Sequence, residues 1–315
     1  MCHKNLDQVF MLMNSLYSAQ SDIVIHIDSS VPNDEYFSFL DRVKNIKNIY
    51  ITEERIHGVL DTRSLVDIVF VMLRCVKEKK LTYQYYCLLS GQDLPIKPIS
   101  MINDLLNNSY PKPYIDCTPY DKNNWIYHKF KDTPLIRSYN DFISEHFSSK
   151  NPIRKGLRAT AFLAAKIARL LKLNFYHSFC RKGISLYGGS AWWILPDIAI
   201  DDIYDKYVAS DKIVSLLLKS YTPEETFFQI MTKMSPVKDL VEINPKEQVL
   251  QNCKTWAYFF DEDKPFMGHP YIFSTNDFDK LKESNFWFAR KFDITTEPKI
   301  IQLVIDNLCK ESNKQ

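Results

Sequence analysis

Residues 85–95 read YYCLLSGQDLP, an apolar run followed by a polar turn, and the α/β interpretation of the chain starts from this pattern. Tyr85 to Leu89 form a short apolar run, and Ser90 to Asp93 follow it with residues that favour a turn. An earlier run, Ile23 to Ile27, ends in the same way at Asp28. We interpret each run as a buried strand that leads into a polar turn.

Segments with helical spacing alternate with these strands. Apolar residues recur with the helical period in 6–19 and 64–79, and 48–51 is a third, weaker strand pattern. Strands that alternate with helices predict an α/β fold with a mostly parallel central sheet flanked by helices. Ligands of such sheets bind at the carboxyl ends of the strands, where Asp28 and Asp93 both lie.

The composition argues against several classes of protein. The chain has 315 residues, of which 45% are hydrophobic and 25% charged, which is typical of a globular protein. Its net charge of +2 argues against nucleic acid as a partner. Seven scattered cysteines without a C-x-x-C pair favour reduced thiols over a zinc site, and no signal-peptide or membrane-spanning pattern occurs. We therefore expect a cytoplasmic protein.

One stretch has an unusual charge distribution, because no Asp or Glu occurs between His146 and Pro196 while nine Lys and Arg do. Six of these, from Arg154 to Lys172, fall on about a third of a helical turn, with apolar residues on the other side. The simpler interpretation is a solvated basic face whose apolar side covers the protein's own core. The alternative is a membrane-surface segment over 150–182, attracted to anionic lipid at the inner face of the plasma membrane.

Several common catalytic motifs do not occur. The sequence has no G-x-x-x-x-G-K-[ST], G-x-G-x-x-G, G-x-S-x-G or H-E-x-x-H. This argues against P-loop NTPases, simple dinucleotide enzymes and hydrolases with an elbow serine. Two D-x-D pairs, at 261/263 and 277/279, lie in polar stretches, and we interpret them as turn or cap residues rather than metal ligands.

Five segments together resemble one enzyme family, and they occur in the order found there. They read CHKNLDQV (2–9), IHID (25–28), LLSGQDLP (88–95), GGSAWWIL (188–195) with PEETFF (223–228), and FWFARKFD (286–293). The family is that of the core-2/I-branching β-1,6-N-acetylglucosaminyltransferases and peptide O-xylosyltransferases. The FARKFD sequence makes the chain more similar to the xylosyltransferase-like and bacterial branch.

The resemblance implies a GT-A-type α/β fold and an inverting transfer of a sugar, with no metal and no cofactor. The donor would be a UDP-sugar, N-acetylglucosamine or xylose being the expected sugar, and the acceptor a hydroxyl of a glycan or lipid-linked glycan. Within one catalytic domain, residues 1–135 would form the Rossmann-like, UDP-sugar-binding half. Residues 136–315 would bind the acceptor and carry the catalytic base.

Site residues follow from the match to each motif. Glu225 would be the general base, with Glu224 a neighbouring charge that raises the pKa of Glu225. Arg290 and Lys291 would bind the diphosphate. Without the resemblance, the two glutamates are ordinary acidic residues at a helix start, and Arg290 and Lys291 are a surface pair beside a core strand.

The remaining matches concern the two sugars and the nucleoside. Asp28 would hold the uridine end and Asp93 would lie near the donor sugar, although Asp93 alone is equally a turn or cap residue. Trp192 and Trp193 offer aromatic faces to an acceptor sugar. The alternative is that one tryptophan belongs to the core and the other lines the cleft.

Three departures from the family pattern stand out. Residues 58–64 lack a tryptophan and two glycines that are usual in the family. An arginine that some animal members place about twenty residues before FARKFD is also missing, and His269 is a candidate for part of its diphosphate role. Relatives also place an apolar strand before the CHKN block. We therefore expect one of two outcomes. Either the sequence starts several codons inside the true reading frame, or the fold leaves an open slot where relatives have this strand. These departures keep open an alternative function, a catalytically inactive glycan- or nucleotide-binding module.

Overall fold

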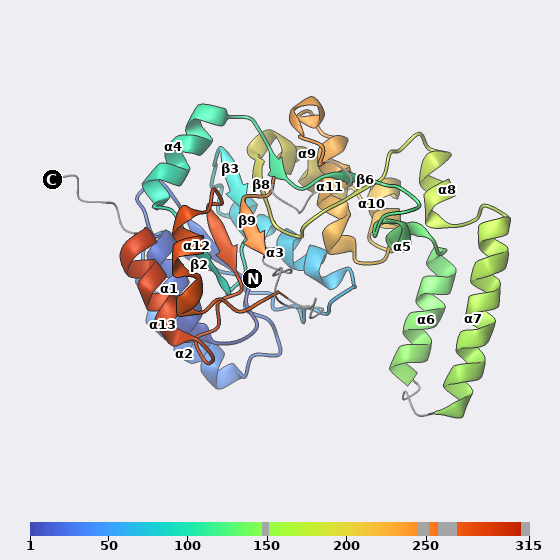
Figure 1. Cartoon of the computed structure of the whole chain (residues 1–315), viewed down its shortest axis with the longest axis horizontal. Helices are drawn as coiled ribbons and strands as arrows, with labels where there is room; N and C mark the ends of the chain where they lie inside the picture. The colour runs from blue at the N-terminus through green and yellow to red at the C-terminus, as the bar shows by residue number, and fades with distance from the viewer. Residues whose placement is uncertain (147–150, 245–251, 258–269, 310–315) are drawn as a thin grey trace.

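The first third of the chain alternates helices and strands as predicted. The computed structural model describes residues 1–146, 151–244, 252–257 and 270–309, apart from the side chains at 134, 137, 141, 144 and 145. Its first elements are α1 (Leu6–Leu16), β1 (Ile23–Ile25), α2 (Asn33–Val43), β2 (Ile49–Ile51), α3 (Ser64–Glu78) and β3 (Tyr85–Cys87) (Figure 1). This order confirms the α/β class.

The sheets differ from the prediction in the direction of their strands. The later strands are β4 (Asp93–Pro95), β5 (Tyr114–Ile115), β6 (Thr118–Pro119), β7 (Tyr187–Gly188), β8 (Trp193–Pro196), β9 (Thr255–Ala257) and β10 (Phe288–Arg290). The orders are β1-β2, β4-β10-β9, β3-β8-β5 and β6-β7. Only β1-β2 and β9-β10 are parallel among the strand pairs of the described residues. The expectation of a mostly parallel central sheet is therefore wrong, because strands from the second half return antiparallel to β3 and β4.

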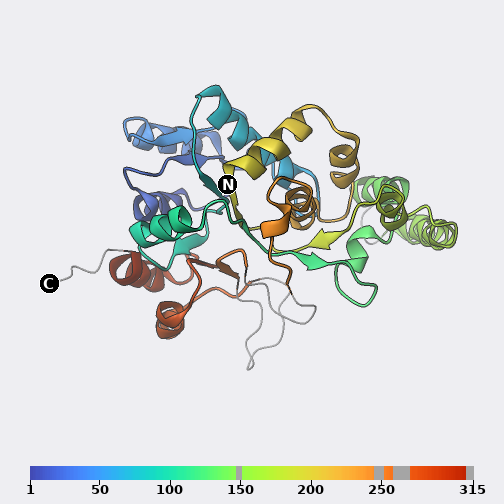
Figure 2. The ribbon, with the colours of Figure 1, turned by 90° about the horizontal axis from the view of Figure 1, so that it is seen from above.

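Helices surround these sheets and extend to one side of them (Figure 2). They are α4 (Ile99–Ser109), α5 (Tyr127–Phe130), α6 (Pro134–His146), α7 (Pro152–Leu170), α8 (Phe175–Cys180), α9 (Asp197–Val208), α10 (Lys212–Leu217), α11 (Phe227–Lys233), α12 (Phe278–Glu283) and α13 (Pro298–Val304). Short helical turns are η1 (Pro223–Glu225), η2 (Lys238–Leu240), η3 (Thr275–Asp277) and η4 (Ile305–Cys309). No helix in the described part of the chain combines the length and apolar character needed to cross a bilayer.

The largest core cluster contains side chains from both sides of residue 135. Phe70 of α3 stacks on Tyr207 of α9 at 3.5 Å between ring centroids and on Phe228 of α11 at 6.1 Å. These contacts join the two halves of the chain in one core. The assignment of donor binding to 1–135 and acceptor binding to 136–315 stays a prediction.

A cavity of about 560 Å³ lies between β1 and β3, lined mostly by apolar side chains of α1, α3, α4 and both strands. Met1 and Cys2 cross one end of it. The Cys2 N–H donates to the His26 carbonyl at 2.9 Å, and the Met1 ammonium donates to the Leu89 carbonyl at 3.0 Å. The two outcomes expected from the sequence, a start inside the true frame or an open slot in the fold, stay predictions.

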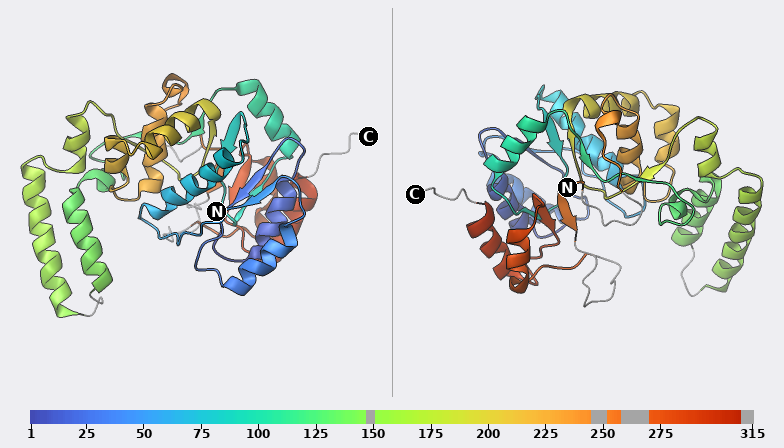
Figure 3. Two further views of the ribbon diagram at one scale, coloured as in Figure 1. Left: turned by 180° about the vertical axis from the view of Figure 1, so that it is seen from behind. Right: turned by 45° about the horizontal axis from the view of Figure 1, so that its top comes forward.

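Helices α6 and α7 form a hairpin that extends away from the rest of the molecule (Figure 3). The buried side chains of α7 are Ala161 and Ala165. Of the five residues of its predicted apolar side, Leu157 is half-buried and the other four are exposed: Leu163 59%, Ile167 49%, Leu170 76% and, just after the helix, Leu171 63%. The interpretation that this apolar side covers the protein's own core is therefore wrong.

Gly189 allows two segments of backbone to approach each other closely. A Cβ atom at this position would lie 2.0 Å from the Asp116 carbonyl oxygen and 2.9 Å from the Asp116 Cβ. Real side chains do not approach backbone atoms so closely, so only glycine fits here without movement. The close approach positions residues 188–192, which carry the first tryptophan of the GGSAWW sequence.

We expect Gly189→Ala to lower the free energy of unfolding by about 1–3 kcal/mol, because the added methyl group overpacks the contact with Asp116. The matched control is Gly156→Ala on α7, where an added Cβ meets no atom within 4 Å. That variant should gain up to about 1 kcal/mol, because alanine favours helix interiors over glycine. Urea unfolding of both variants tests this, and equal effects would contradict it.

Candidate functional site

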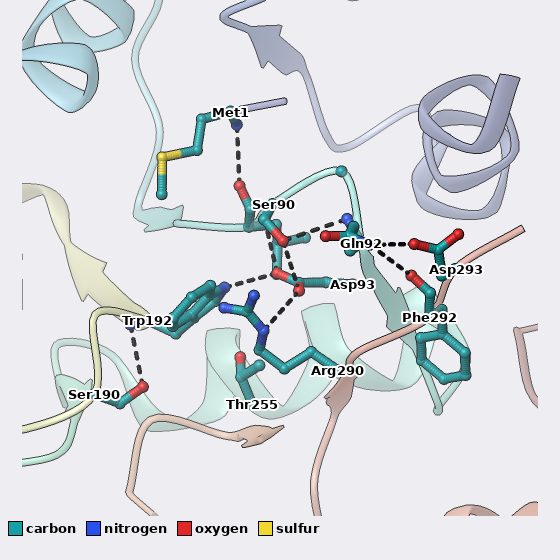
Figure 4. Close-up of polar contacts among 12 residues, drawn as sticks. Met1, Ser90, Gln92, Asp93, Ser190, Trp192, Thr255, Arg290, Phe292 and Asp293 are labelled. Carbon is teal, nitrogen blue, oxygen red and sulfur yellow. Dashed lines mark hydrogen bonds and ion pairs between the residues drawn. The ribbon is translucent and has the colours of Figure 1, made fainter. Parts of the chain in front are cut away.

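Asp93, at the start of β4, organises the centre of the candidate site. Its side chain is fully buried. Oδ2 accepts hydrogen bonds from the Ser90 N–H and the Trp192 Nε1–H, both at 2.7 Å, and Oδ1 accepts from the Ser90 hydroxyl at 2.8 Å (Figure 4). Asp93 thus ties the turn after β3 to the tryptophan of another segment.

Arg290, the last residue of β10, lies against this carboxylate and ring. Its Nε is 3.6 Å from Asp93 Oδ1, and its Cζ is 3.5 Å from the centroid of the Trp192 ring. Burial lowers the pKa of Arg290, and the charge of Asp93 opposes this effect. Its Nε is buried without a hydrogen-bond partner in the part of the chain that the structure describes. A buried and incompletely paired guanidinium is well suited to bind an anion.

More positive groups gather beside Arg290. Desolvation lowers the pKa of Lys291, and the charges of Lys4 and Arg290 lower it further. His3 shows the same effects, since desolvation comes first and the charges of Lys4, Lys291 and Arg290 follow. The N-terminal CHKN sequence and the FARKFD sequence thus meet in one cationic cluster, which we define as Lys4, Arg290 and Lys291, with the His3 imidazole beside it.

Asp293 partly balances this cluster and connects it to the turn after β3. Its Oδ2 lies 2.7 Å from Lys4 Nζ and accepts a hydrogen bond from Gln92 Nε2 at 3.1 Å. Burial raises the pKa of Asp293, but hydrogen bonds from Lys4 and Thr295 outweigh that effect and lower it to about 2. Sequence reasoning missed His3 and Lys4 as site residues, although the CHKN block contained the signal.

Asp28 lies at the end of the first strand segment, as predicted, and it organises the following loop. Oδ1 is 2.8 Å from the Ser30 N–H and 2.9 Å from His57 Nδ1, and Oδ2 accepts the Gly58 N–H at 2.6 Å. Burial raises the pKa of Asp28, but these hydrogen bonds outweigh it, so the pKa lies well below its usual range. Its role in uridine binding stays a prediction.

Glu225 forms an ion pair that the sequence did not reveal. In η1, its Oε2 lies 2.5 Å from Nζ of Lys129, a residue of α5. The Lys129 side chain is 8% exposed and that of Glu225 38%, so only the carboxylate faces open space. Lys129 also donates to the Thr222 hydroxyl. The ammonium therefore holds the Glu225 carboxylate in place.

Glu224 has a different environment from its neighbour. Desolvation raises the pKa of Glu224 to about 7, and the charge of Glu225 adds to this shift. Its Oε1 accepts the Asp61 N–H at 3.2 Å, while its Oε2 is buried without a hydrogen-bond partner among the described residues. Burial is thus the main cause of the raised pKa of Glu224.

Residues 188–192 connect the glutamates with the Asp93 centre. The Gly189 N–H donates to the Glu225 carbonyl at 2.9 Å, and Gln229 Nε2 donates to the Ser190 carbonyl at 2.7 Å. Trp192 then reaches Asp93, whereas Trp193 is 2% exposed and lies in the core. Trp192 is thus the tryptophan of the pair that a ligand can contact.

Two predicted features lie elsewhere. His269 and the 261/263 D-x-D pair fall outside the described residues. Asp277 caps η3, since its Oδ2 accepts from the Ser274 N–H at 2.8 Å. Within the described ranges, no three His, Cys, Asp or Glu side chains come together as metal ligands. The absence of a metal from the reaction stays a prediction.

We expect Glu224→Gln to change how stability depends on pH. The folded protein holds a proton at Glu224 that the unfolded chain releases between pH 4.5 and about 7. Wild-type stability therefore falls as the pH rises through this range, and the glutamine variant escapes that loss. The variant should gain thermal stability relative to wild type from pH 4.5 to pH 8, and the exposed control Glu283→Gln should not. A constant difference would contradict the raised pKa.

Comparisons with known proteins agree with the resemblance of the motifs. No family model matches the chain. It is 20% identical to a zebrafish (Danio rerio) protein named beta-1,3-galactosyl-O-glycosyl-glycoprotein beta-1,6-N-acetylglucosaminyltransferase 4. The alignment covers 99% of this chain and 69% of the zebrafish protein. The chain is therefore similar, at a distance, to a glycosyltransferase over nearly its whole length.

Proposed function

We propose that this protein is a glycosyltransferase that moves a sugar from a nucleotide-sugar donor to a glycan hydroxyl. The observation that carries the proposal is the cationic cluster beside Asp93 and Trp192. Such a cluster can bind the diphosphate of a donor. Residues 188–192, which include Trp192, also hydrogen-bond to the backbone of Glu225. The similarity to the zebrafish enzyme supports the same class of reaction.

The residues suit a direct displacement at the anomeric carbon. Glu225 takes the proton of the acceptor hydroxyl, whose oxygen then bonds to the anomeric carbon. The bond between that carbon and the diphosphate oxygen breaks, and its electron pair leaves with the diphosphate. Arg290 and Lys291 stabilise the negative charge that develops there. The reaction inverts the configuration of the transferred sugar.

The finer expectations from the sequence form part of the same proposal. The donor is UDP-N-acetylglucosamine or UDP-xylose, the fold is of GT-A type, and the chain is a bacterial-type family member. Trp192 contacts a sugar through its open face. No metal takes part, because the cationic cluster supplies the positive charge. The acceptor is a glycan or lipid-linked glycan at the cytoplasmic face of a membrane.

The ion pair of Glu225 with Lys129 favours a second candidate, an inactive glycan- or nucleotide-binding module. Lys129 Nζ lies 2.5 Å from Glu225 Oε2, so an ammonium already occupies one oxygen of the carboxylate that would take the proton. Both candidates predict binding of a UDP-sugar. They differ in whether the bound donor is consumed.

We expect calorimetry to detect binding of UDP and of one UDP-sugar with a chelator present. Lys291→Gln should weaken UDP binding about tenfold or more, because a charge-assisted contact with the diphosphate is lost. The matched control is Lys282→Gln, which removes an exposed lysine of α12. Absence of any binding to the wild-type protein would contradict the proposal. Binding that requires a divalent metal would contradict only its metal-free form.

We expect Glu225→Gln to lower turnover about 100-fold or more while UDP binding is unchanged, because the amide cannot accept the proton. The measurement is release of UDP from the bound donor, with water or small glycans as acceptors. Glu224→Gln is the matched comparison and should keep most of the turnover. Loss of turnover in the Glu224 variant alone would assign the base to Glu224. No turnover by the wild-type protein with any acceptor would favour the binding module.

A further inference from the structure

The outer side of α7 is an apolar surface without a partner in the described part of the chain. Seven large apolar side chains between 153 and 173 are about half exposed or more: Ile153, Phe162, Leu163, Ile167, Leu170, Leu171 and Leu173. Isolated exposed apolar residues are common, but a group of this size on one element indicates a binding surface. This apolar surface contains no residue of the candidate site.

Most of these side chains lie along one side of α7 and form an apolar stripe. At 100° per residue, Ile153, Leu163, Ile167 and Leu170 fall within about 100° of the helix circumference. Ala161 and Ala165, which are buried where α7 packs on α6, lie roughly opposite. The contact within the hairpin therefore points the stripe away from the protein.

Charge decides which partner fits this stripe. Lys155 and Lys166 are exposed beside it, and no acidic residue occurs between 147 and 196. Long lysine side chains can extend along apolar surface and place their ammonium groups at a lipid headgroup. Anionic lipid complements this charge, whereas a second copy docked through the same stripe would bring two basic sets together.

We propose that the outer side of α7 and residues 171–173 bind the surface of an anionic membrane. Leu163, Leu170 and their apolar neighbours enter the boundary between headgroups and acyl chains, and the lysines contact lipid phosphates. The helix lies on the membrane rather than across it. The surface would hold the protein beside lipid-linked substrates, although the interaction itself does not require the proposed activity.

Flotation of the whole protein with vesicles tests this proposal. Wild-type protein should float with vesicles of phosphatidylcholine and phosphatidylglycerol, and much less with phosphatidylcholine alone. Leu163→Glu combined with Leu170→Glu should lower partitioning about tenfold or more, because two apolar contacts become charges. Lys155→Gln combined with Lys166→Gln should weaken the preference for the anionic vesicles.

The matched control changes two exposed apolar residues elsewhere, Phe37→Glu on α2 and Val208→Glu on α9, which are 60% and 62% exposed. This control should float like the wild type. Equal flotation of wild-type protein with both kinds of vesicle, or of the Leu163 and Leu170 variant with anionic vesicles, would overturn the proposal. A dimer of the wild-type protein in the absence of lipid, if the Leu163 and Leu170 variant is monomeric, would also overturn the proposal. The stripe would then bind a second copy of the chain. UDP binding is measured in parallel, so failure of the proposed activity is seen separately.

Discussion

The buried carboxylate of Asp93 is the group on which the arrangement of the candidate site depends. It accepts hydrogen bonds from the turn after β3 and from the Trp192 indole, and it faces the Arg290 guanidinium. Segments about 100 residues apart in the chain therefore meet at one charge. Removing one member of a buried ion pair leaves the other uncompensated, at a cost of about 3–5 kcal/mol. Each segment is thus held in place by the charges of the others.

The charges around this centre do not balance. Asp93 faces Arg290, and Asp293 pairs with Lys4, which leaves the positive charge of Lys291 close to both cations. Residues 188–192 link the acidic pair Glu224 and Glu225 to this centre, because the Gly189 N–H donates to the Glu225 carbonyl and the Trp192 indole of the same loop donates to Asp93. The close contact of Gly189 with Asp116 positions that loop.

Local elements were predictable from the sequence, whereas their pairing was not. The spacing of apolar residues identified β1 and α3, because a short apolar run and a helical repeat can be told apart within a short stretch of sequence. The antiparallel return of β8 depends on the path of the second half, which no local period encodes. The same limit applies to the site: motifs identified Arg290 and Glu225, but Lys129 is a single lysine without a spacing signal. For α7, periodicity predicted two faces, and only the packing of Ala161 and Ala165 on α6 shows which one is covered.

The stacking of Arg290 on Trp192 has an optical consequence. The guanidinium of Arg290 covers one face of the Trp192 indole, and the indole N–H donates to Asp93. The wavelength and intensity of Trp192 fluorescence therefore depend on both neighbours. An anion that draws Arg290 toward itself changes the surroundings of this ring, while Trp193 stays packed on Phe228. The intrinsic fluorescence of the protein therefore contains a component that responds to occupancy of the cationic cluster. Titration of ligands can be followed through a side chain of the site itself, with no added label.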